Sequence, residues 1–356
     1  MQSAVNRQVV GSNPTTPAIN DILNIMKTIL ILIPALDEKF IEQTVDSAID
    51  NSSGDYQIRF GILEQSLTGN FSNLQSSDDI EIIKVHTPKP RGVGWARSTL
   101  CGLIKDEDYT LVIDGHTLFT PNWDYELVTR FEKISEDLGP KSVVTQCLHW
   151  ALIEEDHLII DPWTSAMPPW KLKIDGLVAK AENFDKYKDY EVHYSLSCHF
   201  MFSYSKNFLD VPFDKDIFFI SEEPILGLRY CTRGYNLVAI NYNPMYHLSK
   251  YSVRPEGDWK MYFDIEKTID DAIMLIDVLT GRYIGERGSP DIESLEKFKK
   301  DSGISLSVIM DKLGARNENE LSQIIRTLLR TSFEDNDTWT ALYETLYNLT
   351  CKEPLT

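Results

Sequence analysis

Cysteine is scarce in this sequence, and its placement excludes a disulfide framework. The five cysteines are odd in number and show no C-x-x-C spacing, standing at Cys101, Cys147, Cys198, Cys231 and Cys351. Scattered thiols of this kind are typical of a reducing compartment, so we expect a cytoplasmic protein. A catalytic thiol remains a minor alternative.

Long apolar runs are also missing. No stretch reaches the roughly 18 to 20 apolar residues that a helix needs to cross a bilayer. Near the start, Arg7 is not followed by the apolar core of a signal peptide. We therefore expect no membrane partner.

Positive charge is in deficit. The chain has 35 Lys and Arg against 54 Asp and Glu, a net charge of −19 over 356 residues. A general grip on nucleic-acid phosphates needs a basic face, which this balance disfavours. One locally basic groove stays compatible with it.

What is present is a regular alternation of apolar strands and amphipathic helices. Strands are predicted at 29–33, 58–63, 80–85 and 110–113, with helices at 38–49 and 92–103 between them. This order predicts an α/β fold with a parallel sheet in this half. Neither a Walker loop nor a G-x-G-x-x-G follows the first strand, so P-loop and dinucleotide-binding functions are disfavoured.

The flanks of this region have a different character. Residues 1–25 are expected to be an N-terminal tail. A translation start at Met26, which is followed almost at once by the first strand, is a further hypothesis. A catalytic domain is expected over 26–255. From 256 to 356 the pattern is helical, at 261–279, 295–301, 306–313, 318–329 and 338–349. We expect this region to support the catalytic domain or to mediate self-association into a homo-oligomer.

The stretch with the clearest chemistry is the end of the fourth strand. Leu111, Val112 and Ile113 are followed at once by Asp114, Gly115 and His116. Ligands in such sheets collect at the carboxyl ends of the strands, and residues i and i+2 of an extended segment point the same way. A carboxylate beside an imidazole suits Mn²⁺ or Mg²⁺ with positions left for phosphate oxygens. An ordinary strand end with a surface acid is the alternative.

A second candidate lies at a predicted helix start, where Arg91 and Arg97 flank Gly92, Gly94 and Trp95. Free amide groups and the helix dipole favour anions there, and arginine forks add bidentate phosphate contacts. A solvated helix terminus with Trp95 in the core is the competing interpretation.

Several segments together resemble a known family. In order they are Ile33–Glu38, Gly61–Gln65, Arg91–Arg97, Ile113–His116, Trp123–Asp124, Phe213–Asp214, Phe218–Glu223 and Met245–His247. Their order and spacing are similar to the cytoplasmic UDP-GlcNAc:polypeptide (hydroxyproline) N-acetylglucosaminyltransferases and, more distantly, to the polypeptide GalNAc-transferases. The resemblance runs from about Ile29 to Ile304 and implies a GT-A fold, a Rossmann-like mixed sheet, with a helical C-terminal extension. In that group the D-x-D signature appears as D-x-H.

The resemblance also implies an activity and a set of site residues. It implies a metal-dependent glycosyltransferase that takes a sugar, GlcNAc first, from a UDP-sugar donor and transfers it with retention to a hydroxyl acceptor. The metal ligands would be Asp114, His116 and His247, and the candidate catalytic residues Glu222 and Glu223, although acids are common in a first helical turn. The substrate-binding residues would be Pro34, Leu36, Asp37, Gln65, Arg91, Trp95, Arg97 and Ile113.

Three departures from the family pattern bear on the substrate. Ala35 and Leu36 stand where small polar and basic residues are more usual, Gly115 replaces a serine, and Ser221 replaces a glycine. They leave the sugar and the acceptor open. Besides a protein hydroxyl, a hydroxymethylated base of DNA in a viral or bacterial setting is an alternative acceptor. A non-catalytic nucleotide-sugar-binding module is the third hypothesis.

Overall fold

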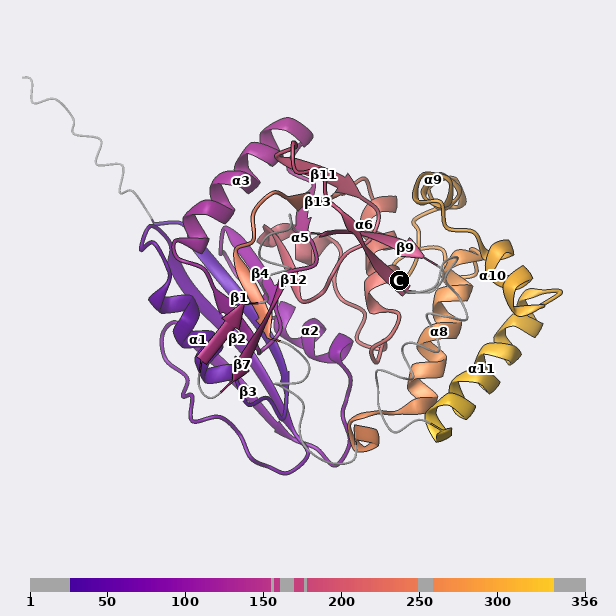
Figure 1. Ribbon diagram of the computed structural model, residues 1–356, viewed down its shortest axis with the longest axis horizontal. Helices are drawn as coiled ribbons and strands as arrows, with labels where there is room; N and C mark the ends of the chain where they lie inside the picture. Colours follow the sequence, from indigo (N-terminus) through magenta and orange to yellow (C-terminus); the bar gives the residue numbers. More distant parts are fainter. Residues whose placement is uncertain (1–25, 155–156, 161–169, 176–177, 249–258, 336–356) are drawn as a thin grey trace, which may run out of the picture.

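The computed structural model describes residues 26–154, 157–160, 170–175, 178–248 and 259–335 (Figure 1). The expected N-terminal tail, the predicted domain boundary near residue 255 and the predicted helix at 338–349 lie outside these residues.

An eight-stranded mixed sheet forms the centre of the fold, in the order β11-β13-β6-β12-β4-β1-β2-β3. Its strands are β1 (Thr28–Leu36), β2 (Gln57–Ser66), β3 (Ile80–His86), β4 (Tyr109–Ile113), β6 (Ser142–Thr145), β11 (Tyr190–His193), β12 (Phe200–Tyr204) and β13 (Asn236–Ile240). Strands β3, β2, β1 and β4 are all parallel, as the sequence predicts for this half. The sheet becomes mixed at β12, which pairs antiparallel with β4.

Two smaller sheets accompany it. The four-stranded sheet has the order β5-β14-β7-β8 and comprises β5 (Thr117–Phe119), β14 (Met245–Leu248), β7 (His149–Glu154) and β8 (His157–Ile160). The remaining pair is β9 (Trp170–Asp175) with β10 (Val178–Asn183). The four-stranded sheet matters for the site because β5 follows directly on the tip of β4.

Helices cover both faces of the central sheet. They are α1 (Ile41–Asp50), α2 (Val93–Cys101), α3 (Trp123–Leu138), α5 (Ser205–Asp210) and α6 (Glu222–Thr232). On β1, Ile29, Ile31 and Ile33 point to the side of α1 and α3, and Leu30 and Leu32 to the side of α2 and α6. Burial on both faces explains why β1 is a continuous apolar run and not an alternating one.

The C-terminal helices pack on the outer side of α6. They are α8 (Ile265–Leu279), α9 (Ile292–Ser302), α10 (Leu306–Leu313) and α11 (Glu318–Asp335), and the short 3-10 helix η1 (Trp259–Tyr262) precedes them. Figure 1 shows α8, α10 and α11 grouped at one side of the molecule. Ile225 and Leu228 of α6 share one apolar cluster with Leu275 of α8 and Leu321 of α11. Among the described residues, no helix is both long and apolar enough to cross a membrane.

Candidate active site

Strand β4 brings Asp114 to the edge of the sheet. All five residues of the strand are buried, and it is held between β1 and β12. Ile113, one of the predicted substrate-binding residues, is fully buried in the apolar core at the end of this strand. The chain then leaves the core, so Asp114 and His116 come to lie at the surface of the site, half-buried.

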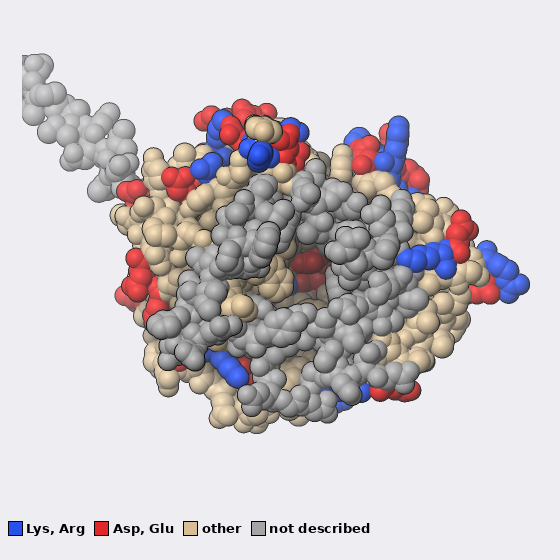
Figure 2. Space-filling view, in the orientation of Figure 1, with Lys and Arg blue, Asp and Glu red and all other residues tan. Residues whose placement is uncertain are grey.

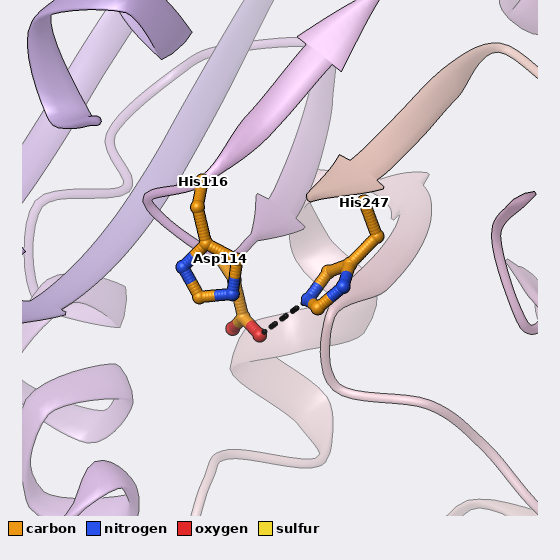
Figure 3. Close-up of side chains that lie close together, drawn as sticks. All are labelled: Asp114, His116 and His247. Carbon is orange, nitrogen blue, oxygen red and sulfur yellow. Dashed lines mark hydrogen bonds and ion pairs between the residues drawn. The ribbon is translucent and has the colours of Figure 1, made fainter. Parts of the chain in front are cut away.

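His247 comes to the same place from a distant part of the sequence. Strand β14 pairs antiparallel with β5, so that His247 lies opposite Thr117, and the Leu248 amide donates to the His116 carbonyl at 2.9 Å. As a result, one ligand atom from each of Asp114, His116 and His247 lies within 4.8 Å of the others (Figure 3). Nε2 of His247 is 3.3 Å from Oδ2 of Asp114. One carboxylate and two imidazoles at this separation form a donor set suited to a divalent metal ion.

Glu38 fixes the orientation of His116. Its Oε2 lies 2.7 Å from Nδ1 of His116, which leaves Nε2 of that ring available as a ligand. The approach depends on Gly115, because a Cβ at that position would lie 2.8 Å from Cγ of Glu38. The sequence indicated Glu38 only as part of the β1 motif, and no signal in the sequence joins it to His116.

The protonation states follow from these contacts. Burial would raise the pKa of Asp114, but the hydrogen bond from His247 and the charge of Arg97 lower it well below its ordinary value. Burial would lower the pKa of His116, but its hydrogen bond with Glu38 raises it. The carboxylate of Asp114 is therefore charged across the physiological range, as a metal ligand must be.

Arg97 joins Asp114 to α6. Its guanidinium is almost fully buried and pairs through Nη2 with Oδ1 of Asp114 at 3.0 Å and through Nη1 with Oε2 of Glu222. The sequence placed Arg97 at the diphosphate, whereas here its fork is engaged by two carboxylates. Nε of Arg97 and Oε1 of Glu222 are buried without a protein partner.

Glu223, the neighbour of Glu222 in the first turn of α6, belongs to a second hydrogen-bonded chain. Its Oε1 accepts from the Cys198 amide at 2.9 Å and from the Ser197 hydroxyl at 3.3 Å. Burial raises the pKa of Glu223 to about 7, against the effect of the Cys198 amide.

The series of hydrogen bonds that begins at Glu223 continues to His199, a histidine that sequence reasoning missed. Nδ1 of His199 lies 2.5 Å from the Ser197 hydroxyl, and the ring of His199 lies 4.9 Å from that of His247 between centroids. The Leu148 amide donates to Nε2 of His199 at 3.3 Å. Burial and the charge of His247 lower the pKa of His199 to about 3, so the ring is neutral. His199 directly precedes β12, whose antiparallel pairing with β4 brings it to the site, and no motif in the sequence marks it.

A pocket of about 320 Å³ adjoins the three candidate ligands. Pro34 and Leu36 from the tip of β1 and Gln65 from β2 line it, as do Asp114 and His116. Four aromatic side chains complete it, and we refer to them as the aromatic wall: Phe218, Phe219, Tyr262 and Phe263. The size and lining are those of a site for a small organic ligand.

Asp37 lies in an adjoining pocket of about 370 Å³, which shares Glu38, Gln65 and Tyr262 with the first. Its carboxylate accepts from the Ser66 hydroxyl at 2.6 Å and from the Leu67 amide at 3.2 Å. The backbone of Asp37 has a positive φ of 45°, an uncommon conformation for a residue other than glycine.

Arg91 and Trp95 lie at the start of α2 and outside the residues that line the first pocket. The guanidinium of Arg91 is exposed and lies 3.7 Å from the centre of the Trp95 ring, a cation–π contact. Gly92 and Gly94, beside them, allow another segment of the backbone to approach closely. A Cβ on Gly92 or Gly94 would lie within 3 Å of the backbone of residues 214–218.

The space-filling view shows one hollow on the face of the molecule that it presents. In Figure 2 the middle of the visible face is hollowed, and Asp or Glu side chains lie at the bottom of the hollow. Separately, the contacts of Arg97 and Cys198 bring three acids, Asp114, Glu222 and Glu223, to one region of the fold.

Comparisons with known proteins give one matching family model. A family model described as Glycosyltransferase (GlcNAc) matches residues 38–268, more than half of the chain. No curated protein gives a significant match by sequence.

Two solved structures are similar. A crystal structure of GalNAc-T7 with UDP, GalNAc and Mn²⁺ superposes with a TM-score of 0.54 at 15% identity, over 82% of this chain and 57% of that chain. This chain therefore spans little more than half the length of that structure. S. aureus TarS residues 1–349, in complex with UDP-GlcNAc, gives a TM-score of 0.45 at 12% identity, over 91% of this chain and 84% of that chain. The likeness to GalNAc-T7 confirms the predicted GT-A fold.

Proposed function

Because the chain belongs to the glycosyltransferase (GlcNAc) family, we propose that it transfers a sugar, GlcNAc in the first place, from a UDP-sugar to a hydroxyl acceptor. The observation that carries this proposal is the convergence of Asp114, His116 and His247 beside a pocket of about 320 Å³. The UDP that accompanies the structure of GalNAc-T7 supports a UDP-sugar as donor.

The three candidate ligands fit a divalent ion, and we propose Mn²⁺ or Mg²⁺. The fit rests on the donor set and on the partner of His116, since a ligating histidine commonly gives its other ring nitrogen to a carboxylate, here Glu38 at 2.7 Å. The chemistry that the ion supplies is the neutralisation of negative charge on the departing diphosphate. GalNAc-T7 was solved with Mn²⁺, which favours that ion.

Different residues of the protein would contact the nucleotide and the sugar of the donor. Pro34, Leu36 and Gln65 would contact the nucleotide, as residues that line the pocket at the tips of β1 and β2. Glu222 would contact the sugar, because its buried Oε1 has no protein partner and can accept a hydrogen bond from a sugar hydroxyl. The buried Nε of Arg97 can donate to the same ligand.

Glu223 is the candidate for contact with the acceptor hydroxyl. Only Oε1 of its carboxylate is engaged by Ser197 and Cys198, and the raised pKa suits a group that exchanges a proton near neutrality. We propose retention of configuration, for which an obligatory protein base is not required.

We propose a protein hydroxyl, hydroxyproline first, as the acceptor. The net charge of −19 and the acids at the bottom of the hollow favour a protein over DNA, whose phosphates such a surface repels. The unpaired thiols of Cys101, Cys147, Cys198 and Cys231 are consistent with a cytoplasmic setting.

UDP release tests the proposal without knowledge of the acceptor. The chain would be incubated with UDP-GlcNAc, UDP-GalNAc, UDP-glucose and UDP-galactose, with Mn²⁺ and with a chelator. We expect slow hydrolysis of one donor that depends on the metal. The proposal is wrong if no donor is hydrolysed and calorimetry shows no binding of UDP in the presence of Mn²⁺.

A further inference from the structure

A buried carboxylate on the C-terminal helix α8 contacts the segment that carries the aromatic wall. Asp271 is only 3% exposed. Its Oδ1 accepts from the amide of Phe218 at 2.9 Å, and its Oδ2 accepts from the amide of Phe219 at 2.7 Å. Both carboxylate oxygens are therefore used to hold the backbone of one short segment.

That segment leads directly into α6. Helix α6 begins at Glu222, and the side chain of Ser221 at its N-cap makes no capping hydrogen bond. The usual local cap is missing, and a side chain from another helix binds the turn just before it. Asp271 thus fixes the position of the turn before α6, and with it the positions of Glu222 and Glu223 in the first turn of that helix.

A second contact from the C-terminal region ties the same segment further back. Nε of Arg287 lies 2.7 Å from Oδ2 of Asp214. Phe218, which Asp271 holds through its amide, also packs on the start of α2, where the Val93 amide donates to the Phe218 carbonyl at 2.9 Å. Displacement of the segment would therefore disturb the α2 side of the pocket as well.

The aromatic wall itself joins the two regions. Phe263 lies between η1 and α8, and its ring centre is 5.8 Å from that of Phe218 and 5.9 Å from that of Phe219. Phe263 of the C-terminal region and Phe218 and Phe219, which precede α6, thus form one surface of the pocket.

Burying a carboxylate here carries a cost in stability. Burial raises the pKa of Asp271 to about 7, even though backbone amides oppose that change. An apolar side chain at this place in the helix would avoid the cost if α8 served only as a support. The use of an acid indicates that the geometry of the bound segment matters.

We propose that Asp271 is a positioning residue of the donor site, which sets the aromatic wall and the carboxylates of α6, so that α8 is a working part of the enzyme. Asp271 and Arg287 both lie beyond residues 38–268, the part that matches the family model. The inference rests on the proposed function, since it takes the pocket to be the site of the UDP-sugar.

The test compares Asp271→Asn with Asp270→Asn. Asp270 is the adjacent residue of the same helix, and its side chain is 70% exposed, so the control makes the same change of charge on the surface. Asparagine has one side-chain oxygen, so Asp271→Asn loses one of the two buried hydrogen bonds that the carboxylate accepts from the amides of Phe218 and Phe219. We expect UDP with Mn²⁺ to bind about 10-fold more weakly, which corresponds to roughly 1.4 kcal/mol. Amide hydrogen exchange over residues 214–223 should become faster, and Asp270→Asn should match the wild type in both measurements.

The outcomes separate the inference from the function. If the wild type binds UDP and the folded Asp271→Asn protein binds it equally well, Asp271 has a structural role only and the inference is wrong. If the wild type binds no UDP, the proposed function itself fails. Should the variant not fold, exchange in the wild type decides, because UDP must then protect α8 together with residues 214–223. Binding without protection of α8 would overturn the inference.

Discussion

Oε2 of Glu38 lies 2.7 Å from Nδ1 of His116, and this contact determines which ring nitrogen of His116 faces Asp114 and His247. The contact spans two strand tips, since Glu38 follows β1 and His116 follows β4. A metal-ligating histidine whose other ring nitrogen is bound by a carboxylate is held in one tautomer and one orientation.

Glu38→Ala should weaken Mn²⁺ binding about 10- to 100-fold, the range found when such a partner of a ligating histidine is removed. Glu38→Gln should weaken it less, because the amide oxygen can still accept from Nδ1–H. The affinity would be measured by electron paramagnetic resonance of free Mn²⁺. Asp46→Asn, at an exposed acid of α1, is the control. Equal affinities in all three variants would show that Glu38 does not act on the metal.

Asp114→Asn and His116→Ala should each abolish metal-dependent UDP release while the protein stays folded. Both residues lie after the last buried residue of β4 and not within the core, so their side chains contribute little to packing. Release would be followed with the preferred donor, and folding by circular dichroism. Full activity of either variant in the presence of a chelator would remove these residues from the metal site.

Arg97→Met should destabilise the fold by about 3 to 5 kcal/mol, because it leaves a buried carboxylate without its partner. The pair is buried on both sides, with side-chain exposures of 6% for Arg97 and 3% for Glu222. Combining it with Glu222→Gln should recover part of the loss, which thermal melts of the four proteins of the cycle would reveal. Strict additivity of the two changes would indicate that the ion pair is not coupled in solution.

Glu223→Gln should reduce the dependence of stability on pH. The pKa of Glu223 is raised from an ordinary value of 4.5 to about 7, so the folded protein holds a proton that the unfolded chain has lost. Its contribution is fully present below pH 4.5 and is lost as the pH rises through 7, by at most about 3 kcal/mol.

The glutamine keeps an oxygen for Ser197 and Cys198 but cannot ionise. We therefore expect the melting temperature of the wild type to fall more than that of Glu223→Gln between pH 5 and pH 8. Parallel melting curves across this range would contradict the raised pKa.

Much of the fold was predictable because it rests on local patterns. The apolar runs of β1 and β4 and the helix at 306–313 lie where periodicity placed them. Asp114 and His116 could be proposed from their place after a buried strand. His247 came only with the family resemblance, since its approach depends on a strand pairing between β14 and β5.

The partners of charged groups could not be predicted. Sequence gives Arg97 a charge but not its neighbours, and in the folded chain these are Asp114 and Glu222 rather than open solvent. The same holds for the start of α2, where Gly92 and Gly94 suggested a free anion site. The Val93 amide is instead bound by the Phe218 carbonyl, from a segment more than one hundred residues later. Such contacts depend on packing between distant elements.

The pairing of β14 with β5 also bears on how the protein matures. Thr117 pairs with His247, which lies far later in the chain. The long loop between them makes this contact slow to form and costly in conformational entropy. A nascent chain that has exposed β4 and β5 alone carries only two of the three candidate ligands, Asp114 and His116. The metal centre would thus be completed late in synthesis, after most of the catalytic domain has left the ribosome. An ion bound at that stage would add to the stability of the pairing between β14 and β5 without being required for the fold.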